Sequence, residues 1–128
     1  MKTPLAAVPR QWAWHDRALV RLGHTLAGES GARSAALRET VEHGGNDRAD
    51  AANDESAHES LLAEIRQEQA ELTEIEAALE RIRQGTYGVC ELTGAPIEAE
   101  RLRAVPWARC SLAAAKQLER TAKPRLFR

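Results

Sequence analysis

The stretch YGVCELTG (residues 87–94), followed by RLRAVPWARCS (residues 101–111), decides the fold of the C-terminal part of the chain. Together the two stretches are typical of a zinc knuckle that has lost ligands, because tetrahedral zinc takes four thiolate or imidazole ligands, usually from two Cys-x-x-Cys pairs about 15 to 20 residues apart. Here Cys90 opens the first pair but Thr93 closes it, and all four histidines precede residue 87. The chain offers two thiolates at most, so we expect no bound zinc.

The residues around these positions resemble the DksA/TraR family, whose pattern runs Tyr-Gly-x-Cys-x-x-Cys-Gly-x-x-Ile, then Arg-Leu-x-Ala-x-Pro, then a second Cys-x-x-Cys. The resemblance covers roughly the last third of the chain and implies a member that has lost cysteines and folds without zinc. It also implies a bacterial transcription regulator that inserts a helical hairpin into the secondary channel of RNA polymerase. The matching residues are Tyr87, Gly88, Cys90, Gly94, Ile97, Arg101, Leu102, Ala104 and Pro106.

The resemblance also identifies the positions where zinc ligands have been lost. Aligned to the family without gaps, Ser111 and Ala114 take the third and fourth positions, and Cys110 falls on an apolar neighbour. A shift of one residue would place Cys110 and Ala113 there instead. The vestigial ligand positions are therefore Cys90, Thr93, Cys110 or Ser111, and Ala113 or Ala114.

Composition agrees with one small protein that carries an extended arm. The chain has 128 residues, of which 4% are aromatic and 29% charged, too few aromatics for a large core. The N-terminus lacks the apolar region of a signal peptide, and no stretch is apolar enough to span a membrane. Two cysteines without an export signal favour reduced thiols, so we expect a cytoplasmic protein. We also expect a monomer.

Charge is segregated along the chain. Residues 41–80 carry twelve acids against two bases, a net charge of −10, whereas residues 1–40 and 81–128 are net basic at +3 and +6. An acidic surface disfavours direct DNA binding, which needs clustered lysine and arginine, and it favours a basic protein partner. An ordinary solvated helix face explains the acidity equally simply.

Hydrophobic periodicity predicts a mostly all-α fold built on a long antiparallel helical hairpin. The strong seam, broken only at Glu68, steps by three and four residues as in a coiled coil through Leu61, Ile65, Leu72, Ile75, Leu79 and Ile82. Its helix should start near Asn46 or Asp47 and stop at Gly85. The predicted order is an N-terminal segment (1–14), a coiled-coil hairpin (15–85, tip near 44–52), and a degenerate zinc-finger-like lobe with a C-terminal helix (86–128).

The first arm of the hairpin has a weaker stripe, interrupted by three glycines that each cost up to about 1 kcal/mol of helix stability. It should therefore depend on packing against the second arm. Its predicted seam residues are Leu19, Leu22, Leu26, Leu37 and Val41.

The predicted tip carries DRADAA (residues 47–52). This resembles the Asp-x-x-Asp-x-Ala tip of the family, at the family's distance from Cys90. The resemblance implies that Asp50 is the principal effector, Asp47 its companion, and Ala52 a small residue that permits close approach to the polymerase. Alternatively, Asp47 only caps the helix, with Asp50 assisting the first turn.

The lobe needs an apolar cluster in place of a metal. We expect its C-terminal helix to span residues 111–122 with Ser111 as the N-cap. The predicted cluster contains Val89, Leu92, Ile97, Leu102, Val105, Trp107, Leu112 and Leu118, with Trp12 and Trp14 added from the N-terminal segment.

Two further expectations concern ligands and chemistry. Family members act with guanosine tetraphosphate through basic side chains that fall on Glu74 and Val105 here, and an acid repels a polyphosphate while valine offers no donor. We therefore expect nucleotide synergy to be weak or absent. The chain has no glycine-rich phosphate loop and no Ser-His-Asp pattern, so we expect no enzyme.

Two alternative functions stay open beside the polymerase-binding regulator. One is an adaptor coiled coil that keeps the family fold without effector activity. The other is a thiol redox sensor that uses Cys90 and Cys110.

Overall fold

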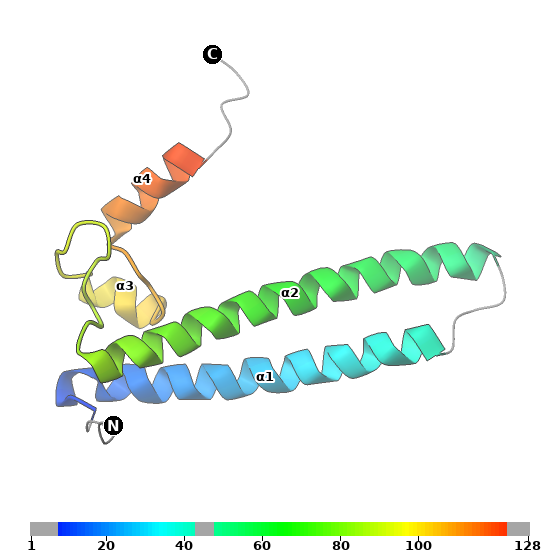
Figure 1. The fold of residues 1–128 in the computed structure, drawn as a ribbon, viewed down its shortest axis with the longest axis horizontal. Helices are drawn as coiled ribbons and strands as arrows, with labels where there is room; N and C mark the ends of the chain where they lie inside the picture. Colours follow the sequence, from blue (N-terminus) through cyan, green and yellow to red (C-terminus); the bar gives the residue numbers. More distant parts are fainter. Residues whose placement is uncertain (1–7, 43–47, 123–128) are drawn as a thin grey trace, which may run out of the picture. The chain divides into compact units, whose positions relative to one another are not determined.

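The computed structural model describes residues 8–42 and 48–122, with side chains over residues 8–39 and 55–121. The mostly helical fold that we predicted is confirmed (Figure 1). Within the described helices, none combines the length and the apolar composition that crossing a membrane requires. The elements are η1 (Arg10–Trp12), α1 (Ala13–Glu42), α2 (Arg48–Gln84), α3 (Ala99–Ala104) and α4 (Leu112–Ala122).

The long helix α2 ends where the sequence predicted. Gly85 follows it with a φ of 79°, a left-handed conformation that glycine adopts without steric cost. The amide of Gly85 donates to the carbonyl of Ile82 at 3.3 Å, and the amide of Thr86 donates to the carbonyl of Arg81 at 2.9 Å. This pair of bonds is a Schellman motif, which satisfies the last carbonyls of the helix and turns the chain into the lobe.

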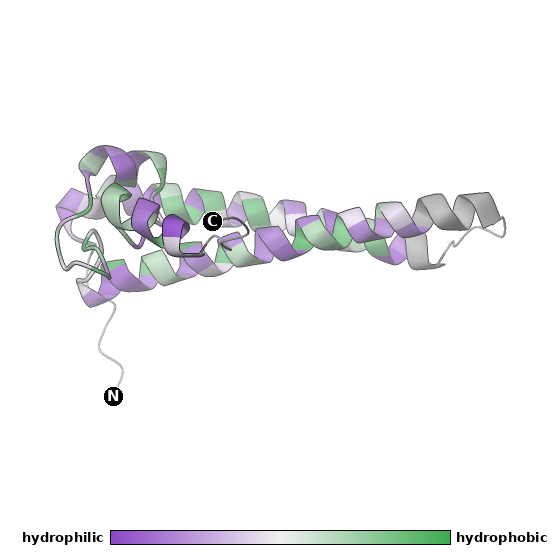
Figure 2. Cartoon of the chain, turned by 90° about the horizontal axis from the view of Figure 1, so that it is seen from above, coloured by the Kyte–Doolittle hydropathy of each residue, from purple (hydrophilic) through white to green (hydrophobic). Residues whose placement is uncertain are grey.

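The chain divides into two compact units, Met1–Val20 with Ile75–Arg128 and Arg21–Glu74. In the second unit, α1 and α2 pack along a seam whose residues step by three and four on each helix. Hydrophilic and hydrophobic residues recur along both helices (Figure 2), and the seam itself contains both kinds. It is formed by Gly23, Leu26, Ser30, Arg33 and Leu37 of α1 and by Leu61, Ile65, Glu68 and Leu72 of α2, all buried or half-buried.

The predicted seam of the first arm was partly wrong. Leu22 is 37% exposed, whereas Ser30 is buried and Arg33 is half-buried. The prediction counted apolar residues only, and the true seam of α1 contains a glycine, a serine and an arginine at regular coiled-coil spacing. The side chain of Val41 lies outside those that the structure describes.

In the first unit, the beginning of α1 and the end of α2 form a core with the C-terminal lobe. His15 and Leu19 of α1 are buried, as are Ile75 and Ile82 of α2. The lobe adds a small set of buried side chains: Tyr87, Cys90, Ile97, Leu102, Ala108, Cys110 and Ala114. Ile97 and Leu102 were predicted, whereas the apolar pattern did not predict that four of these seven lobe side chains are alanine or cysteine.

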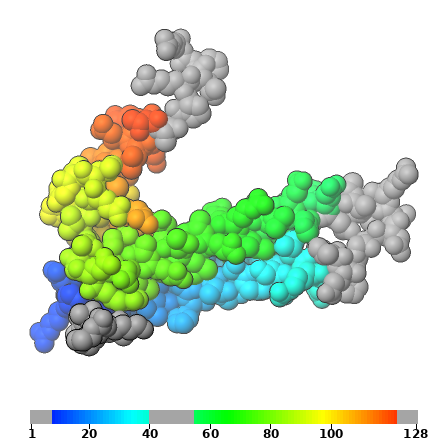
Figure 3. All heavy atoms as spheres, in the orientation of Figure 1, coloured from blue at the N-terminus to red at the C-terminus, as the bar shows by residue number. Residues whose placement is uncertain are grey.

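Four members of the predicted lobe cluster are exposed instead. Val89, Leu92, Leu112 and Leu118 are 44–57% exposed. On the face shown in Figure 3, the spheres of α4 stand out from the rest of the lobe over most of the helix, which agrees with the exposure of most of its side chains. The short α3 gave no clear sequence signal, and it carries the fully buried Leu102.

The predicted capping of the C-terminal helix is confirmed. The hydroxyl of Ser111 accepts a hydrogen bond from the amide of Ala114 at 3.3 Å, directly before α4 begins. The carboxylate of Glu98 accepts another from the amide of Leu112 at 3.1 Å. Both bonds satisfy amides that the helix itself leaves free, and the negative charge suits this end of the helix dipole.

Candidate functional site

The predicted effector tip lies mostly outside what the structure describes. Asp47 falls between the two described ranges, 8–42 and 48–122. Asp50 and Ala52 belong to the beginning of α2, and their side chains are not among those described. The roles of these three residues therefore stay predictions.

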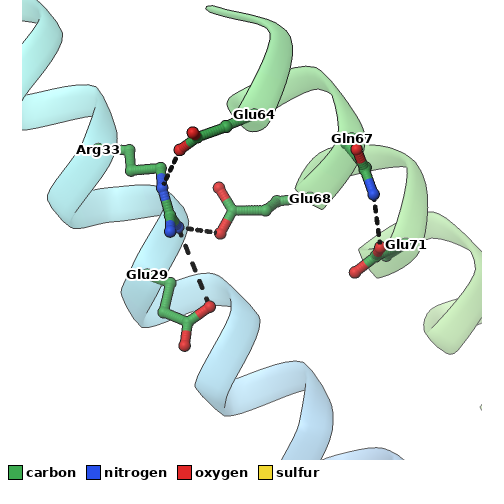
Figure 4. Close-up of polar contacts among 6 residues, drawn as sticks. All are labelled: Glu29, Arg33, Glu64, Gln67, Glu68 and Glu71. Carbon is green, nitrogen blue, oxygen red and sulfur yellow. Dashed lines mark hydrogen bonds and ion pairs between the residues drawn. The ribbon is translucent and has the colours of Figure 1, made fainter. Parts of the chain in front are cut away.

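A charged cluster occupies the seam of the second unit. Figure 4 shows Arg33 of α1 extending toward Glu64 and Glu68 of α2. Its Nε donates to Oε2 of Glu64 at 2.7 Å, its Nη1 donates to Oε2 of Glu68, and Glu29 on its own helix lies 4.0 Å away. Glu68 is 8% exposed, and its Oε1 has no hydrogen-bond partner among the described residues. This arginine therefore neutralises the single acid that interrupts the seam.

An aromatic cluster joins the N-terminal segment to the lobe. The Trp12 ring meets the Tyr87 ring edge-on at 4.8 Å between centroids and the His15 ring at 5.1 Å. The Tyr87 hydroxyl donates to the carbonyl of Pro106 at 2.7 Å. Burial lowers the pKa of His15, and the charge of Arg103 lowers it further. The predicted contribution of Trp12 is confirmed, whereas Trp14 is 38% exposed and stacks against Arg103 at 4.4 Å.

The two segments that carry the cysteines are held side by side by main-chain hydrogen bonds. In the first segment, Val89 and Pro96 form an isolated β-bridge, and the amide of Cys90 donates to the carbonyl of Ala95 at 2.8 Å. The amide of Glu91 then donates to the carbonyl of Arg109 at 2.9 Å, which connects this turn to the second segment. Cys90 and Cys110 consequently lie next to each other in the fold.

Both cysteines are buried, free of disulfide, and in contact through their sulfurs. Cys90 is 1% exposed and Cys110 is 8% exposed. The side chain of Cys110 is hydrogen-bonded to that of Cys90. The sequence left open whether Cys110 or Ser111 takes the first position of the second ligand pair. Cys110 contacts Cys90 with its side chain, whereas Ser111 directs its hydroxyl to the start of α4.

The surroundings of Cys90 favour its thiolate. A hydrogen bond from the Thr93 hydroxyl is the largest cause that lowers the pKa of Cys90 to about 6, and a main-chain bond from Ser111 comes next. Burial and the neighbouring charge of Cys90 raise the pKa of Cys110. The pair thus favours one thiolate that accepts hydrogen bonds and one thiol that donates to it.

These residues do not fit a tetrahedral zinc ion. Thr93 stands where the first pair should close, Ala113 is exposed, and Ala114 has no donor atom. Among the described side chains, no group of three or more histidine, cysteine or acidic residues could hold a metal ion. A closed structural zinc site needs four ligands, and two sulfurs supply half of them.

Comparisons with known proteins show which family the lobe resembles and which solved structure shares the fold. Residues 85–120 match the family model for the prokaryotic DksA/TraR C4-type zinc finger. The solved structure of transcription factor DksA2 from Pseudomonas aeruginosa matches with a TM-score of 0.78 and 28% sequence identity, over 94% of this chain and 92% of that one. The lobe of this chain is of the DksA/TraR type, and the fold of nearly the whole chain is similar to that of DksA2. The lobe is depleted in cysteine, because only two cysteines remain where the family model is of a four-cysteine type.

Two sequence relatives match parts of this chain. The RNA polymerase-binding transcription factor DksA of Caulobacter vibrioides is 37% identical over 89 residues, which are 65% of this chain and 63% of the relative. General stress protein 16O of Bacillus subtilis is 50% identical over 48 residues, 38% of this chain and 29% of the relative. The matched regions thus span less than two thirds of these curated relatives.

Proposed function

We propose that this chain is a transcription regulator that binds RNA polymerase and inserts the tip of its helical hairpin into the secondary channel. In this role, Asp50 modulates initiation complexes, Asp47 assists it, and Ala52 permits close approach. The protein regulates an enzyme and catalyses no reaction itself.

The observation that carries this proposal is the likeness to DksA2 along nearly the whole of both chains. The relative from Caulobacter vibrioides, whose name states that it binds RNA polymerase, supports the same partner. The hairpin helices α1 and α2 have 30 and 37 residues. At about 1.5 Å per residue, α2 alone is long enough to carry a tip about 55 Å from its base.

The experiment that tests the proposal separates binding from effect. Purified chain is incubated with RNA polymerase, and the lifetime of promoter complexes is measured for the wild type and for Asp50→Asn. We expect Asp50→Asn to bind the polymerase as the wild type does and to lose the effect on promoter complexes. Glu59→Gln removes the same charge from an exposed position farther along α2, so it serves as the matched control and should keep the effect.

Crosslinking locates the tip. A photoreactive residue at position 51 should crosslink to the interior of the secondary channel, and one at exposed position 83 should not. Binding without any promoter effect of the wild-type chain would favour an adaptor instead, and absence of binding would refute the proposal.

The contact between Cys90 and Cys110 favours a second candidate function, a thiol redox sensor. Hydrogen peroxide would take two electrons and two protons from the two thiols, giving one disulfide and two molecules of water. If this is the function, peroxide should change the promoter effect of the wild type, and replacing both cysteines with serine should abolish that response.

A further inference from the structure

The zinc-finger lobe of this chain keeps a pair of sulfurs after losing the other ligands. Two buried thiols in contact are too few for zinc, which takes four ligands in structural sites. Soft monovalent ions of the copper group differ from zinc in this respect, because they bond well to two thiolates in a linear arrangement. Thiolate is also the ligand type that selects Cu(I) over harder ions.

The pair is arranged before any ion binds. The turn that carries Cys90 is closed by the bond from its amide to Ala95 and by a bond from Gly94 to the Cys90 carbonyl at 2.9 Å. On the other side, the Nε of Arg101 donates to the carbonyl of Cys110 at 2.8 Å. Main-chain and guanidinium bonds thus fix both backbones, so little conformational entropy is lost when the two sulfurs take a common ligand.

Charge around the pair also suits such an ion. Two thiolates and one monovalent cation leave one negative charge, whereas two thiolates with a divalent cation would be neutral. Thr93 and the main-chain amides near Cys90 donate to its sulfur. At Cys110 the positive charge of Arg101 acts against the larger effect of the negative charge of Glu91. The donors near Cys90 stabilise a residual negative charge that burial would otherwise disfavour.

We propose that Cys90 and Cys110 form a two-coordinate site for a soft monovalent cation, with Cu(I) as its natural ligand. On binding, the Cys110 thiol and any Cys90 that is still protonated release their protons to solvent, and each sulfur forms one bond to the ion. No electron is transferred in this step. Ag(I), which has the same charge and softness, should bind in the same way.

The test uses the full, reduced chain without oxygen. Cu(I) is titrated in competition with a coloured Cu(I) chelator, and Zn(II) is titrated in parallel with a zinc indicator. We expect one Cu(I) per chain to be withheld from the chelator and no Zn(II) to be withheld from the indicator. Cys90→Ser and Cys110→Ser should each abolish Cu(I) retention, since one thiolate cannot supply both bonds.

A matched pair of variants tests the surroundings of the sulfurs. Thr93→Val keeps the side-chain volume but removes the hydroxyl that donates to Cys90, so Cu(I) affinity should fall about tenfold. Thr86→Val makes the same change at an exposed threonine away from the sulfurs and should leave the affinity unchanged.

X-ray absorption of the Cu(I)-loaded wild type provides a readout that does not depend on whether the serine variants fold. Two sulfur neighbours and no nitrogen or oxygen neighbour are expected. Three or four neighbours, retention of Cu(I) by either single serine variant, equal retention of Zn(II), or formation of a Cys90–Cys110 disulfide with release of copper would each overturn the proposal.

Discussion

The guanidinium of Arg33 on α1 donates to the carboxylate of Glu68 on α2, inside the seam between the two helices. Glu68 is the only acid in a row that otherwise contains leucine and isoleucine. A buried carboxylate is tolerated when a fixed cation pairs with it, and it is costly when that partner is absent. The ion pair therefore stabilises the packing of α2 against α1 at the position of Arg33 and Glu68.

Removing the arginine should destabilise the hairpin. We expect Arg33→Ala to lower the free energy of unfolding by about 2 kcal/mol, because it leaves Glu68 buried without its partner. The double variant Arg33→Ala with Glu68→Leu should recover most of this loss. Urea unfolding followed by circular dichroism measures both. Arg38→Ala, at an exposed position on the same helix, is the control and should change stability by less than about 0.5 kcal/mol. An equal loss for Arg33→Ala and Arg38→Ala would contradict the role of the pair.

Gly85, directly after α2, and Gly88, in the lobe, have similar backbone conformations and allow a steric test. Gly88 and Gly85 have φ values of 82° and 79°. A Cβ at Gly88 would lie 2.8 Å from two atoms of the Trp12 ring, whereas a Cβ at Gly85 would meet nothing within 4 Å. Both alanine variants carry the backbone strain of about 1–2 kcal/mol, and Gly88→Ala should lose a further roughly 1–3 kcal/mol because the indole must move. Thermal unfolding of the two variants measures this difference, and similar losses would show that Trp12 can move without cost.

The hydroxyl of Tyr87 should make the lobe sensitive to alkali. Burial raises the pKa of Tyr87 from 10.0 to about 12, and the charge of Arg81 acts in the opposite direction with less effect. A raised pKa means that folding favours the protonated phenol, so this contribution to stability is complete below pH 10 and is lost as the pH rises through about 12. The wild type should therefore lose more stability over this range than Tyr87→Phe does.

Spectroscopy can follow this titration directly. Tyr87 is the single tyrosine of the chain, so phenolate absorbance reports on it alone. A midpoint near pH 10 in the folded protein would contradict the burial of its hydroxyl.

Nucleotide dependence should differ from that of family members with a basic site. Glu74 and Val105 occupy the positions where the family resemblance places basic side chains, so guanosine tetraphosphate should change the promoter effect less than about twofold. Glu74→Lys combined with Val105→Arg should raise the response. In vitro transcription with and without the nucleotide measures it, with Glu76→Lys as a control for charge alone at an exposed position. A large enhancement of the wild type would refute this prediction.

Much of the fold follows from local sequence patterns. The three- and four-residue steps from Leu61 to Ile82 predict a long helix with one buried face, and Gly85 predicts its end. Ser111 predicts the start of α4 for the same local reason, since a cap needs only its own hydroxyl and a nearby amide. Such features depend on residues a few positions apart, and they can be recognised without knowing what packs against them.

The sequence by itself determined the helical hairpin, the shortage of zinc ligands and the resemblance to the DksA/TraR family. The tertiary structure alone decided that Ser30 and Arg33 belong to the seam and that Cys110 contacts Cys90. The physical reason is that a polar or small side chain is buried only when a distant segment satisfies or covers it. For Arg33 that segment is 31–35 residues away, at Glu64 and Glu68, and it becomes a neighbour only once the two helices have packed.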